Sequence, residues 1–520
     1  MSSTLVRGVV AVTGSALALS LGLVAPSAYA APIPAPVGAD PAPVAAGAAY
    51  LAAQPNADGF IVSYFGGAGS VYPGITIDAA TSLAAVGGQD AAFQKMAAAV
   101  EASNYSTTNP PSAAKFAAFE YNTGRSGAGL AAAVDLVEAN VNPSGRLTSP
   151  SYTSPIDQVS AVSALHDAGS SSADSALDFL LTQQCADGSF RGDYSFVDPD
   201  ESCDDADPAE QGANVDTTAW AVLQLQDQRS DSDVAASLTK AAAWLVGHQA
   251  PSGSFNGYGD VPNGNSTGLA AWALGVSNRT DAAGRAALWL RQHQLANAGS
   301  CVTFAPKDVG AIMQDDLGLA TAKTGPLDPD DNSTAAYVTA QALPGLLWAP
   351  GGAAAGDTKL TGPTDFVPAG SGQTVTVAGA PGNTLCVTVG SSSTRVALPA
   401  SGTTTVPVTL PPTTGSVVVS TVDAGGETDS LTLKGLAAAK LKGKAPKQVE
   451  LGEKFKVKIA GLQPGETVVV KYRGTKKTLT ANAKGVVKPK LKAKKLGTSK
   501  VKFTGEFGDR KGKVTVTVVP

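Results

Sequence analysis

Two hydrophobic patterns divide the chain. From about residue 42 to 348, apolar residues recur three and four positions apart, which predicts amphipathic helices. Beyond about residue 364 they alternate with polar residues, as in KFKVKI (454–459), where Phe455, Val457 and Ile459 share one face of a strand and three lysines the other. The pattern predicts a multidomain protein, with an α part followed by a β part.

One short motif recurs in the helical part. KAAAWLVGHQAPSGSF (240–255) places a basic residue, an aromatic-Leu pair, a glutamine and a Gly-x-aromatic end at fixed offsets. RAALWLRQHQLANAGS (285–300) repeats it up to Gly299, while ALDFLLTQQCADGSF (176–190) and AAYLAAQPNADGF (48–60) are looser copies. Apolar spacing followed by a Gly turn indicates a helix that ends at the turn. Such helices are predicted near 42–54, 89–103, 127–140, 172–184, 231–249 and 281–295.

A second, Ala-rich helix follows each copy, as in VDTTAWAVLQL (215–225) and GNSTGLAAWALG (264–275). Each begins with residues whose side-chain oxygens accept hydrogen bonds from the free amides of a helix start. We therefore predict N-caps at Asp78, Ser112, Asp157, Asp216, Asn265 and Asn332. The Ala-rich helices are apolar on nearly every side, whereas the first helices carry charge on one side. An inner and an outer ring, an (α/α)6 toroid of about six helix pairs over residues 41–348, explains both; an open solenoid is the alternative.

The motif K-A-x-x-W-L-x-x-x-Q-x-x-x-G-x-F carries a family resemblance. It is very similar to the Gln–Trp repeat of squalene and hopene cyclases, whose prenyltransferase/squalene-cyclase superfamily also includes protein prenyltransferase β subunits, complement-like thioester domains and vitamin B12 carriers. The resemblance covers roughly residues 40–348 and implies the α/α-toroid fold. It implies little about function, because this fold hosts several unrelated activities. The B12 carriers also join a toroid to a β domain, which suggests a ligand carrier by analogy.

The resemblance also supplies a test for catalysis. The cyclases place their acid in an Asp-x-Asp-Asp-Thr-Ala stretch, and the corresponding residues 214–219 here, NVDTTA, keep one aspartate of three, Asp216. DPDD at 328–331 matches the letters, but is expected in a Pro-containing loop. Aromatic residues make up 6% of the chain, whereas polyene cyclisation needs aromatic walls around its cations. We favour a non-catalytic binding protein; a cyclase-like enzyme with Asp216 as its acid is the alternative.

Other chemistries find little support in the residues. Protein prenylation in the resembled family needs zinc, but His166, His248 and His293 are interpreted as surface or packing residues. The sequence has no Cys-Gly-Glu-Gln run for a thioester and no Gly-x-Ser-x-Gly elbow. The acidic run 198–210 is interpreted as a solvated loop, with Ca²⁺ binding as the alternative. The tripeptide Arg-Gly-Asp at 191–193 is taken as a chance match. We predict neither a metal nor a cofactor.

The starts of the inner helices are the candidate binding site. If these helices run parallel, six positive dipole ends and six polar caps meet at one end of the ring, where a small polar ligand fits. Alternatively, the caps serve only the helices and alanines fill the centre. The candidates for the cavity wall are Asp78, Asp157, Asp216, Asn265, Asn332, Trp220, Tyr258 and Trp272.

Export is predicted from the N-terminus. Arg7 precedes an apolar run from Val9 to Val24, and Ala28-Tyr29-Ala30 provides small residues for cleavage, so residues 1–30 are expected to be a signal peptide followed by a Pro-rich lead, 31–40. No other apolar run is long enough to predict a transmembrane anchor. We therefore expect a secreted, extracellular protein, where disulfides form. Cys185 and Cys203 flank one loop and are predicted to pair; Cys301 and Cys386 would then join two domains, unless Cys386 is a free buried thiol.

The C-terminal part predicts two Ig-like β-sandwiches, 364–435 and 436–520, after a linker at 349–363. QTVTVAGAPGNTLCVTVG (373–390) resembles EKFKVKIAGLQPGETVVVKYRG (453–474), and both show a strand, a Pro-Gly turn and a strand. Residues 436–520 hold 22 Lys+Arg and 5 Asp+Glu, a charge of +17, against 16 and 38, or −22, elsewhere. The last domain is expected to bind an anionic cell-envelope polymer or to act as a soluble spacer. Nucleic acid is not expected, and an extracellular scaffold remains a third reading of the whole chain.

Overall fold

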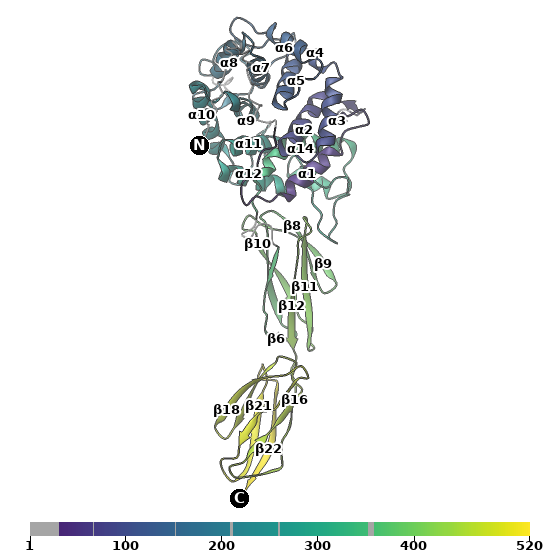
Figure 1. The fold of residues 1–520 in the computed structure, drawn as a ribbon, viewed down its shortest axis with the longest axis vertical. Helices are drawn as coiled ribbons and strands as arrows, with labels where there is room; N and C mark the ends of the chain where they lie inside the picture. Colours follow the sequence, from purple (N-terminus) through teal and green to yellow (C-terminus); the bar gives the residue numbers. More distant parts are fainter. Residues whose placement is uncertain (1–30, 66, 151, 208–211, 258–259, 352–357) are drawn as a thin grey trace, which may run out of the picture.

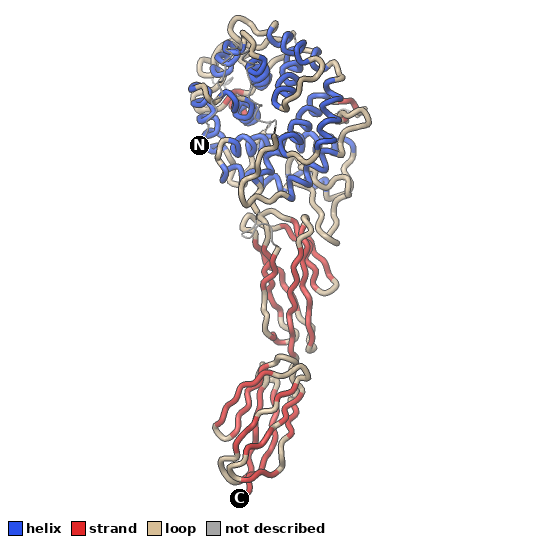
Figure 2. The backbone as a smooth tube through the Cα atoms, in the orientation of Figure 1, coloured by secondary structure: helices blue, strands red, loops and turns tan. Residues whose placement is uncertain are grey.

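A helical unit and two β units follow one another along a long molecule. The computed structural model describes residues 31–65, 67–150, 152–207, 212–257, 260–351 and 358–520. Figure 1 shows the helical unit at one end, the two β units in line below it and the C-terminus at the far tip. Figure 2 separates the same parts by secondary structure. The predicted order, helices and then strands, is confirmed. The predicted signal peptide, 1–30, and Tyr258 lie outside the described residues.

The helical unit contains two sets of six helices. The outer set is α1 (Ala42–Ala52), α3 (Asp90–Glu101), α6 (Leu130–Glu138), α8 (Ala173–Thr182), α10 (Ser232–His248) and α12 (Thr280–Gln292). The inner set is α2 (Pro73–Val86), α5 (Pro110–Asn122), α7 (Pro155–Ala168), α9 (Val215–Gln224), α11 (Gly264–Val276) and α14 (Pro329–Ala342). The ends of the outer helices lie within about three residues of the predicted ones, because their charged and apolar faces alternate at helical spacing.

The inner helices touch one another in a closed circuit. Each contacts the next inner helix along the chain, and α14 contacts α2. Their composition explains their position: twelve of the thirteen residues of α11 are buried, and most are small. At Gly268, an added Cβ would lie 2.2 Å from the Cα of Ala342, so α11 and α14 approach more closely than larger side chains allow. Short helices not predicted from the sequence complete the unit: α4 (Tyr105–Thr108), η1 (Gln226–Gln228), α13 (Asp316–Ala322) and η2 (Leu343–Trp348).

In three copies of the motif, the repeated glutamine joins one outer helix to the next. The Nε2 atoms of Gln184 and Gln249 each donate two hydrogen bonds, one to the carbonyl of the turn glycine and one to a carbonyl of the following outer helix. Gln294 repeats the arrangement, but its second partner is the Pro43 carbonyl at the start of α1. The last outer helix is thereby tied to the first.

The turn glycine is required by backbone geometry. Gly188, Gly253 and Gly310 have φ angles of 97°, 94° and 98°, in the left-handed region that favours glycine. A Cβ at Gly253 would lie 2.3 Å from the carbonyl oxygen of Arg285 in α12. The motif is therefore architectural: its glycine and glutamine set the contact between neighbouring outer helices.

The copy of the motif at 285–300 departs from the prediction. The sequence placed its turn glycine at Gly299, but Gln294 bonds to Gly310, eleven residues later. The intervening segment turns toward the first β unit, where Gly299 lies against Val422 and Cys301 forms its disulfide. An insertion at the turn explains the difference, since the Gln–Gly contact is kept on either side of it.

The predicted N-caps are wrong for all six inner helices. The helices begin earlier, and the polar residues singled out lie within the first two turns. Asp78 is the sixth residue of α2, which starts after Tyr72. The sequence reasoning overlooked that proline is favoured in the first turn of a helix, as at Pro73 in α2. The same holds for the DPDD stretch, which was expected in a loop but forms the cap and first turn of α14. The residues at the other N-cap positions are Asn109, Ser154, Asn214, Asn263 and Asp328.

The two β units share one strand order. In the first, a three-stranded sheet β10-β7-β5 faces a five-stranded sheet β6-β12-β11-β8-β9. In the last, β13-β16-β19 faces β14-β22-β21-β17-β18, with a further pair β15-β20. In both five-stranded sheets the first strand pairs in parallel with the last strand of its unit. Apolar clusters of inward-facing residues fill each sandwich.

The strands of the first β unit are β5 (Lys359–Thr361), β6 (Phe366–Pro368), β7 (Gly372–Ala378), β8 (Thr384–Val389), β9 (Ser392–Ala397), β10 (Thr403–Thr409), β11 (Gly415–Asp423) and β12 (Thr428–Leu436). Those of the last are β13 (Lys442–Lys444), β14 (Gln448–Glu450), β15 (Lys454–Lys456), β16 (Lys458–Ala460), β17 (Thr467–Tyr472), β18 (Thr475–Thr480), β19 (Val486–Val487), β20 (Lys490–Lys492), β21 (Gly497–Thr504) and β22 (Lys511–Val519). The helical unit adds the short pairs β1 (Val62–Ser63) with β2 (Ser70–Val71) and β3 (Phe190–Arg191) with β4 (Ala213–Asn214). Strand β5 lies inside the predicted linker, 349–363, and pairs with β7, so that the linker prediction is too long.

The helical unit and the first β unit are joined at several points. The disulfide Cys301–Cys386 links them, which decides between this pairing and the free Cys386 that the sequence left open. Arg291 of α12 is buried and forms an ion pair with Asp40, 2.5 Å between Nη2 and Oδ2, while its Nη1 donates to the carbonyl of Pro381 in the β unit. The Pro-rich lead therefore packs on the helical unit through Asp40. Among the described residues, no helix is long and apolar enough to cross a membrane.

Candidate functional site

A polar network lies between four inner helices. Lys115 of α5 forms an ion pair with Asp78 of α2, with 2.7 Å between Nζ and Oδ1. The other carboxylate oxygen of Asp78 accepts a hydrogen bond of 3.1 Å from Gln341 of α14. The Gln341 side chain in turn accepts one of 3.0 Å from Asn265 of α11. The side chain of Asp78 is 7% exposed and that of Lys115 is 28%, so the pair is shielded but reachable from solvent.

The charges in this network stabilise one another. Burial lowers the pKa of Lys115, but the negative charge of Asp78 and the nearby Tyr105 and Tyr337 hydroxyls outweigh it, so that the pKa lies above its ordinary value. Burial raises the pKa of Tyr337 to about 12, and the charge of Asp78 acts in the same direction. Lys115 is therefore a permanent cation surrounded by groups that accept hydrogen bonds.

Asp216 presents an unpaired oxygen. It is the second residue of α9, where the Asn214 side chain caps the helix by accepting from the Thr217 amide. The Ser266 hydroxyl of α11 hydrogen-bonds to the Asp216 carboxyl, and burial raises its pKa against the effect of that bond. The Oδ1 atom is inaccessible to solvent and has no hydrogen-bond donor among the residues that the structure describes. A buried acceptor without a donor is costly, and a donor on a ligand would remove that cost.

A pocket of about 480 Å³ adjoins Asp216. Trp244 and His248 of α10 form one wall; their rings stack with centroids 4.1 Å apart, and the Trp244 indole N–H donates to Asp187. These contacts fix the wall before any ligand arrives. The other polar side chains around the pocket are Asn214, Asn256, Asp260 and Ser266.

The predicted cavity residues lie in several places. Asp78 and Asn265 belong to the network, and Asp216 borders the pocket. Asn332 instead accepts a hydrogen bond from the Tyr50 hydroxyl of α1 and points toward the outer helices. The remaining described candidates are Asp157, which accepts from Ser154 at the start of α7, Trp220, which is half-buried, and Trp272, which is 2% exposed and packs edge-on against Trp220.

Sequence reasoning missed Lys115 and Gln341. Both are isolated long polar residues in Ala-rich stretches, PSAAKFAAFE and TAAYVTAQAL. A charge in a helix that is otherwise expected to be buried requires a partner, and this is the signal that points to such a residue. Its partner was not predictable, since Asp78 lies 37 positions away on another helix.

The histidines have the packing roles predicted for them. The Nδ1 atoms of His248 and His293 each lie 2.9 Å from the carbonyl of the tryptophan four residues earlier, Trp244 and Trp289, on whose rings they stack. His166 pairs with the neighbouring aspartate. Across the described ranges, no group of three or more His, Cys, Asp or Glu residues has the arrangement of a metal site.

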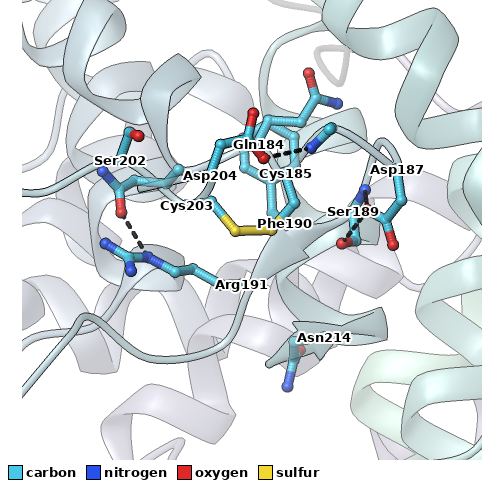
Figure 3. The surroundings of a disulfide bond; sticks show 12 residues. Gln184, Cys185, Asp187, Ser189, Phe190, Arg191, Ser202, Cys203, Asp204 and Asn214 are labelled. Atoms are coloured by element: carbon cyan, nitrogen blue, oxygen red, sulfur yellow. Dashed lines mark hydrogen bonds between the residues drawn. A yellow bond between two sulfur atoms is a disulfide. The ribbon is translucent and has the colours of Figure 1, made fainter. Parts of the chain in front are cut away.

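The Cys185–Cys203 disulfide, also predicted, holds the acidic loop (Figure 3). Arg191 lies beside it, is fully buried and donates 2.8 Å from Nε to the Gln183 side chain. An Arg-Gly-Asp motif needs an accessible arginine for recognition, so this burial agrees with the interpretation of 191–193 as a chance match. Of the loop's carboxylates, Asp204 accepts from the Ala186 amide.

Comparisons with known proteins give weak similarities of fold. No family model and no curated protein matches the sequence. Among solved structures, a protein from Actinoplanes shares 16% identity at a TM-score of 0.40, covering 58% of this chain and 98% of that one. The type II terpene cyclase MstE from Scytonema shares 12% sequence identity at a TM-score of 0.42, and the match covers 59% of this chain and 96% of that one. An ICAM-5 D1–D4 ectodomain fragment shares 18% sequence identity at a TM-score of 0.19, and the match covers 31% of this chain and 53% of that one. Type II terpene cyclases are thus among the structural neighbours, but similarities at these levels carry no information on ligand or activity.

Proposed function

We propose that this chain is an exported binding protein whose helical unit, an (α/α)6 toroid, holds a small polar ligand at the end where its inner helices begin. Two Ig-like sandwiches follow, and the last one associates with an anionic polymer of the cell envelope. The observation that carries the ligand site is the buried, unpaired Oδ1 of Asp216 beside a pocket of about 480 Å³.

The chemistry of the pocket defines the ligand class. An unpaired carboxylate oxygen needs a hydrogen-bond donor, so the ligand presents an ammonium or hydroxyl group to Asp216. Asp260 adds a second carboxylate, and Asn214 and Asn256 offer amides that donate and accept. A hydroxyl-rich or amine-bearing molecule satisfies all of these groups together. The stacked Trp244–His248 wall offers an apolar face for its carbon skeleton.

This lining favours binding over cyclisation. A polyene needs an apolar cavity with aromatic rings around the developing cations. Of the eleven lining residues that the structure describes, six carry polar or ionisable side chains and one, Trp244, is a large aromatic residue. The cyclase alternative, with Asp216 as its acid, is therefore not favoured.

Other observations support the rest of the proposal. The closed circuit of inner helices supports a toroid rather than an open solenoid. The shared strand order, with a parallel first strand, supports two Ig-like sandwiches. Two disulfides suit an oxidising, extracellular compartment. The charge of +17 over residues 436–520 supports an anionic partner for the last unit.

The test is native mass spectrometry of the chain from residue 31 onward, purified from the medium of an expressing culture. Wild type is compared with Asp216→Asn, which keeps the size of the side chain but removes its charge. Asp233→Asn is the matched control, because Asp233 is an exposed aspartate in the first turn of α10, outside the pocket. We expect a small molecule to copurify with wild type and the control and to be lost from Asp216→Asn.

Either of two outcomes contradicts the proposal. An apo mass for wild type, together with a protein partner recovered from the same medium, would favour the extracellular scaffold instead. A small molecule kept equally by Asp216→Asn would place the ligand elsewhere in the helical unit.

A further inference from the structure

Four lysines form a continuous ladder across the larger sheet of the last unit. In the strand register, Lys513 of β22 lies opposite Lys502 of β21, and Lys502 lies opposite Lys471 of β17. Lys471 in turn lies opposite Lys476 of the edge strand β18. All four are exposed. They are called the lysine ladder below.

The ladder has the dimensions of an extended linear chain. Neighbouring strands lie about 4.8 Å apart, so four residues in register span about 14 Å perpendicular to the strands. Their side chains leave the sheet on one side, since the residues flanking them, such as Val470, Val501 and Phe503, are buried in the sandwich. The ladder is therefore a row of four lysines, one on each of four neighbouring strands, on the outer face of the sheet.

The ladder lacks internal neutralisation. Like charges directly opposite one another destabilise a sheet. Within residues 436–520, all of which the structure describes, the ion pair present is Arg510–Glu466, and no ladder lysine takes part in one. A hollow of about 900 Å³ beside β21 and β22 brings Lys440 and Lys511 next to the row, with Asp509 as the single acidic residue in its lining. The positive charge is thus concentrated on this face and left for an external anion.

We propose that the lysine ladder is the contact site for a linear phosphate-bearing polymer of the cell envelope, which lies across the strands and places successive phosphates beside successive lysines. This inference rests on the envelope association proposed above and locates it on one face of one sheet.

The distribution of lysines favours a chain over a bilayer. A second group, Lys454, Lys456, Lys490 and Lys492, faces outward on the opposite side of the sandwich, as two separate pairs on β15 and β20. A flat membrane can meet only one side of the sandwich, whereas the narrow row of the ladder matches a single extended strand of charges. The opposite pairs are also a built-in control, being four lysines in the same domain without a continuous row.

The experiment measures binding of the full exported chain to fluorescently labelled linear inorganic polyphosphate, by anisotropy over a series of salt concentrations. The ladder variant carries Lys→Gln at 471, 476, 502 and 513, and the control variant carries Lys→Gln at 454, 456, 490 and 492. Each phosphate contact contributes about 0.7–0.9 to the slope of log K against log salt. We expect the ladder variant to lose about tenfold or more in affinity and about 3 in slope, and the control variant to lose less than threefold. Thermal unfolding shows whether each variant is folded; relief of like-charge repulsion should not lower the midpoint of the ladder variant.

Each of the other outcomes would refute one part of the proposal. If the ladder variant binds polyphosphate as wild type does, or the control variant loses as much, the ladder is not the site, while the envelope association stands. If wild type prefers phosphatidylglycerol vesicles to polyphosphate and the ladder variant loses that binding, the partner is a lipid surface. If wild type binds neither polyphosphate, vesicles nor isolated cell walls, the envelope association itself is refuted.

Discussion

Gln294 offers the sharpest test of how the helical unit closes. Its Nε2 donates 2.8 Å to the Pro43 carbonyl of α1 and 3.1 Å to the Gly310 carbonyl, and its side chain is 5% exposed. The change Gln294→Leu nearly preserves volume but removes both donors. We therefore expect a loss of stability from unpaired carbonyls rather than from a cavity.

The magnitude follows from the two bonds. A buried polar group left without its partner costs about 1–3 kcal/mol, so two carbonyls predict at most about 2–6 kcal/mol. The Pro43 carbonyl lies in the first turn of α1 and also accepts the helix's own amide bond, which places the loss in the lower part of this range. A small cavity of about 50 Å³ borders Gln294 and Pro43, and a water there can supply one donor. The expected loss is therefore about 2–4 kcal/mol in the free energy of unfolding of the helical unit.

Intrinsic fluorescence isolates that unit. All five tryptophans lie between 220 and 348, so guanidinium unfolding followed by tryptophan emission reports the helical unit and not the sandwiches. The matched control is Gln292→Leu, an exposed glutamine two positions earlier, at the end of α12. Equal unfolding midpoints for the two variants would refute the reasoning, because the repeat glutamine would then contribute no more than a surface residue.

Three further predictions concern charge and covalent linkage. Burial raises the pKa of Glu120 to about 7, so from pH 4.5 to 7 the folded chain keeps a proton that the unfolded chain releases. The free energy of unfolding should therefore fall by on the order of 3 kcal/mol over this range. Unfolding midpoints measured across it should show this fall in wild type and not in Glu120→Gln. Lys115→Met leaves the Asp78 carboxylate without its cation and, because Lys115 is partly exposed, should lower the free energy of chemical unfolding by about 1–3 kcal/mol. The double variant with Asp78→Asn should recover most of this loss, and no recovery would contradict the pairing. Cys386→Ser removes the link to Cys301 and should speed protease cleavage between the helical unit and the first β unit. The unfolding midpoint followed by tryptophan emission should not change. A lower midpoint would show that the disulfide also stabilises the helical unit.

The sequence predicted those parts of the fold that depend on the local hydrophobic pattern of one segment. The outer helices and the alternation in KFKVKI, with Phe455, Val457 and Ile459 buried, are local patterns, and the structure has them as predicted. The Cys185–Cys203 disulfide was also predicted from position and compartment, whereas the Cys301–Cys386 pairing was left open against a free Cys386 and is decided by the structure. Four helix starts were missed because a proline in the first turn precedes the polar residue that was chosen. In α9 and α11 the cap is instead an asparagine two positions before that residue, Asn214 and Asn263.

The candidate site was predicted in part because it depends on which helices become neighbours. Asp216 was singled out from its position at a helix start, but its unpaired oxygen depends on α11 placing Ser266 at one side of it. Lys115 was missed because its partner, Asp78, comes from another inner helix. Gln341 meets Asp78 through the contact of the last inner helix with the first, which no local pattern in the sequence encodes.

The inserted turn after Gln294 has a mechanical consequence. It places Cys301 against β8 of the first sandwich, so a covalent crosslink runs in parallel with the backbone that leaves the helical unit at η2. If the far end of the molecule is held at a wall, force on the helical unit is carried by the backbone and by the disulfide together. While it is oxidised, the bridge restricts rotation of the helical unit relative to the first β unit. Reduction would remove this covalent restraint and leave the contacts of Arg291 with Asp40 and Pro381 to hold the two units together.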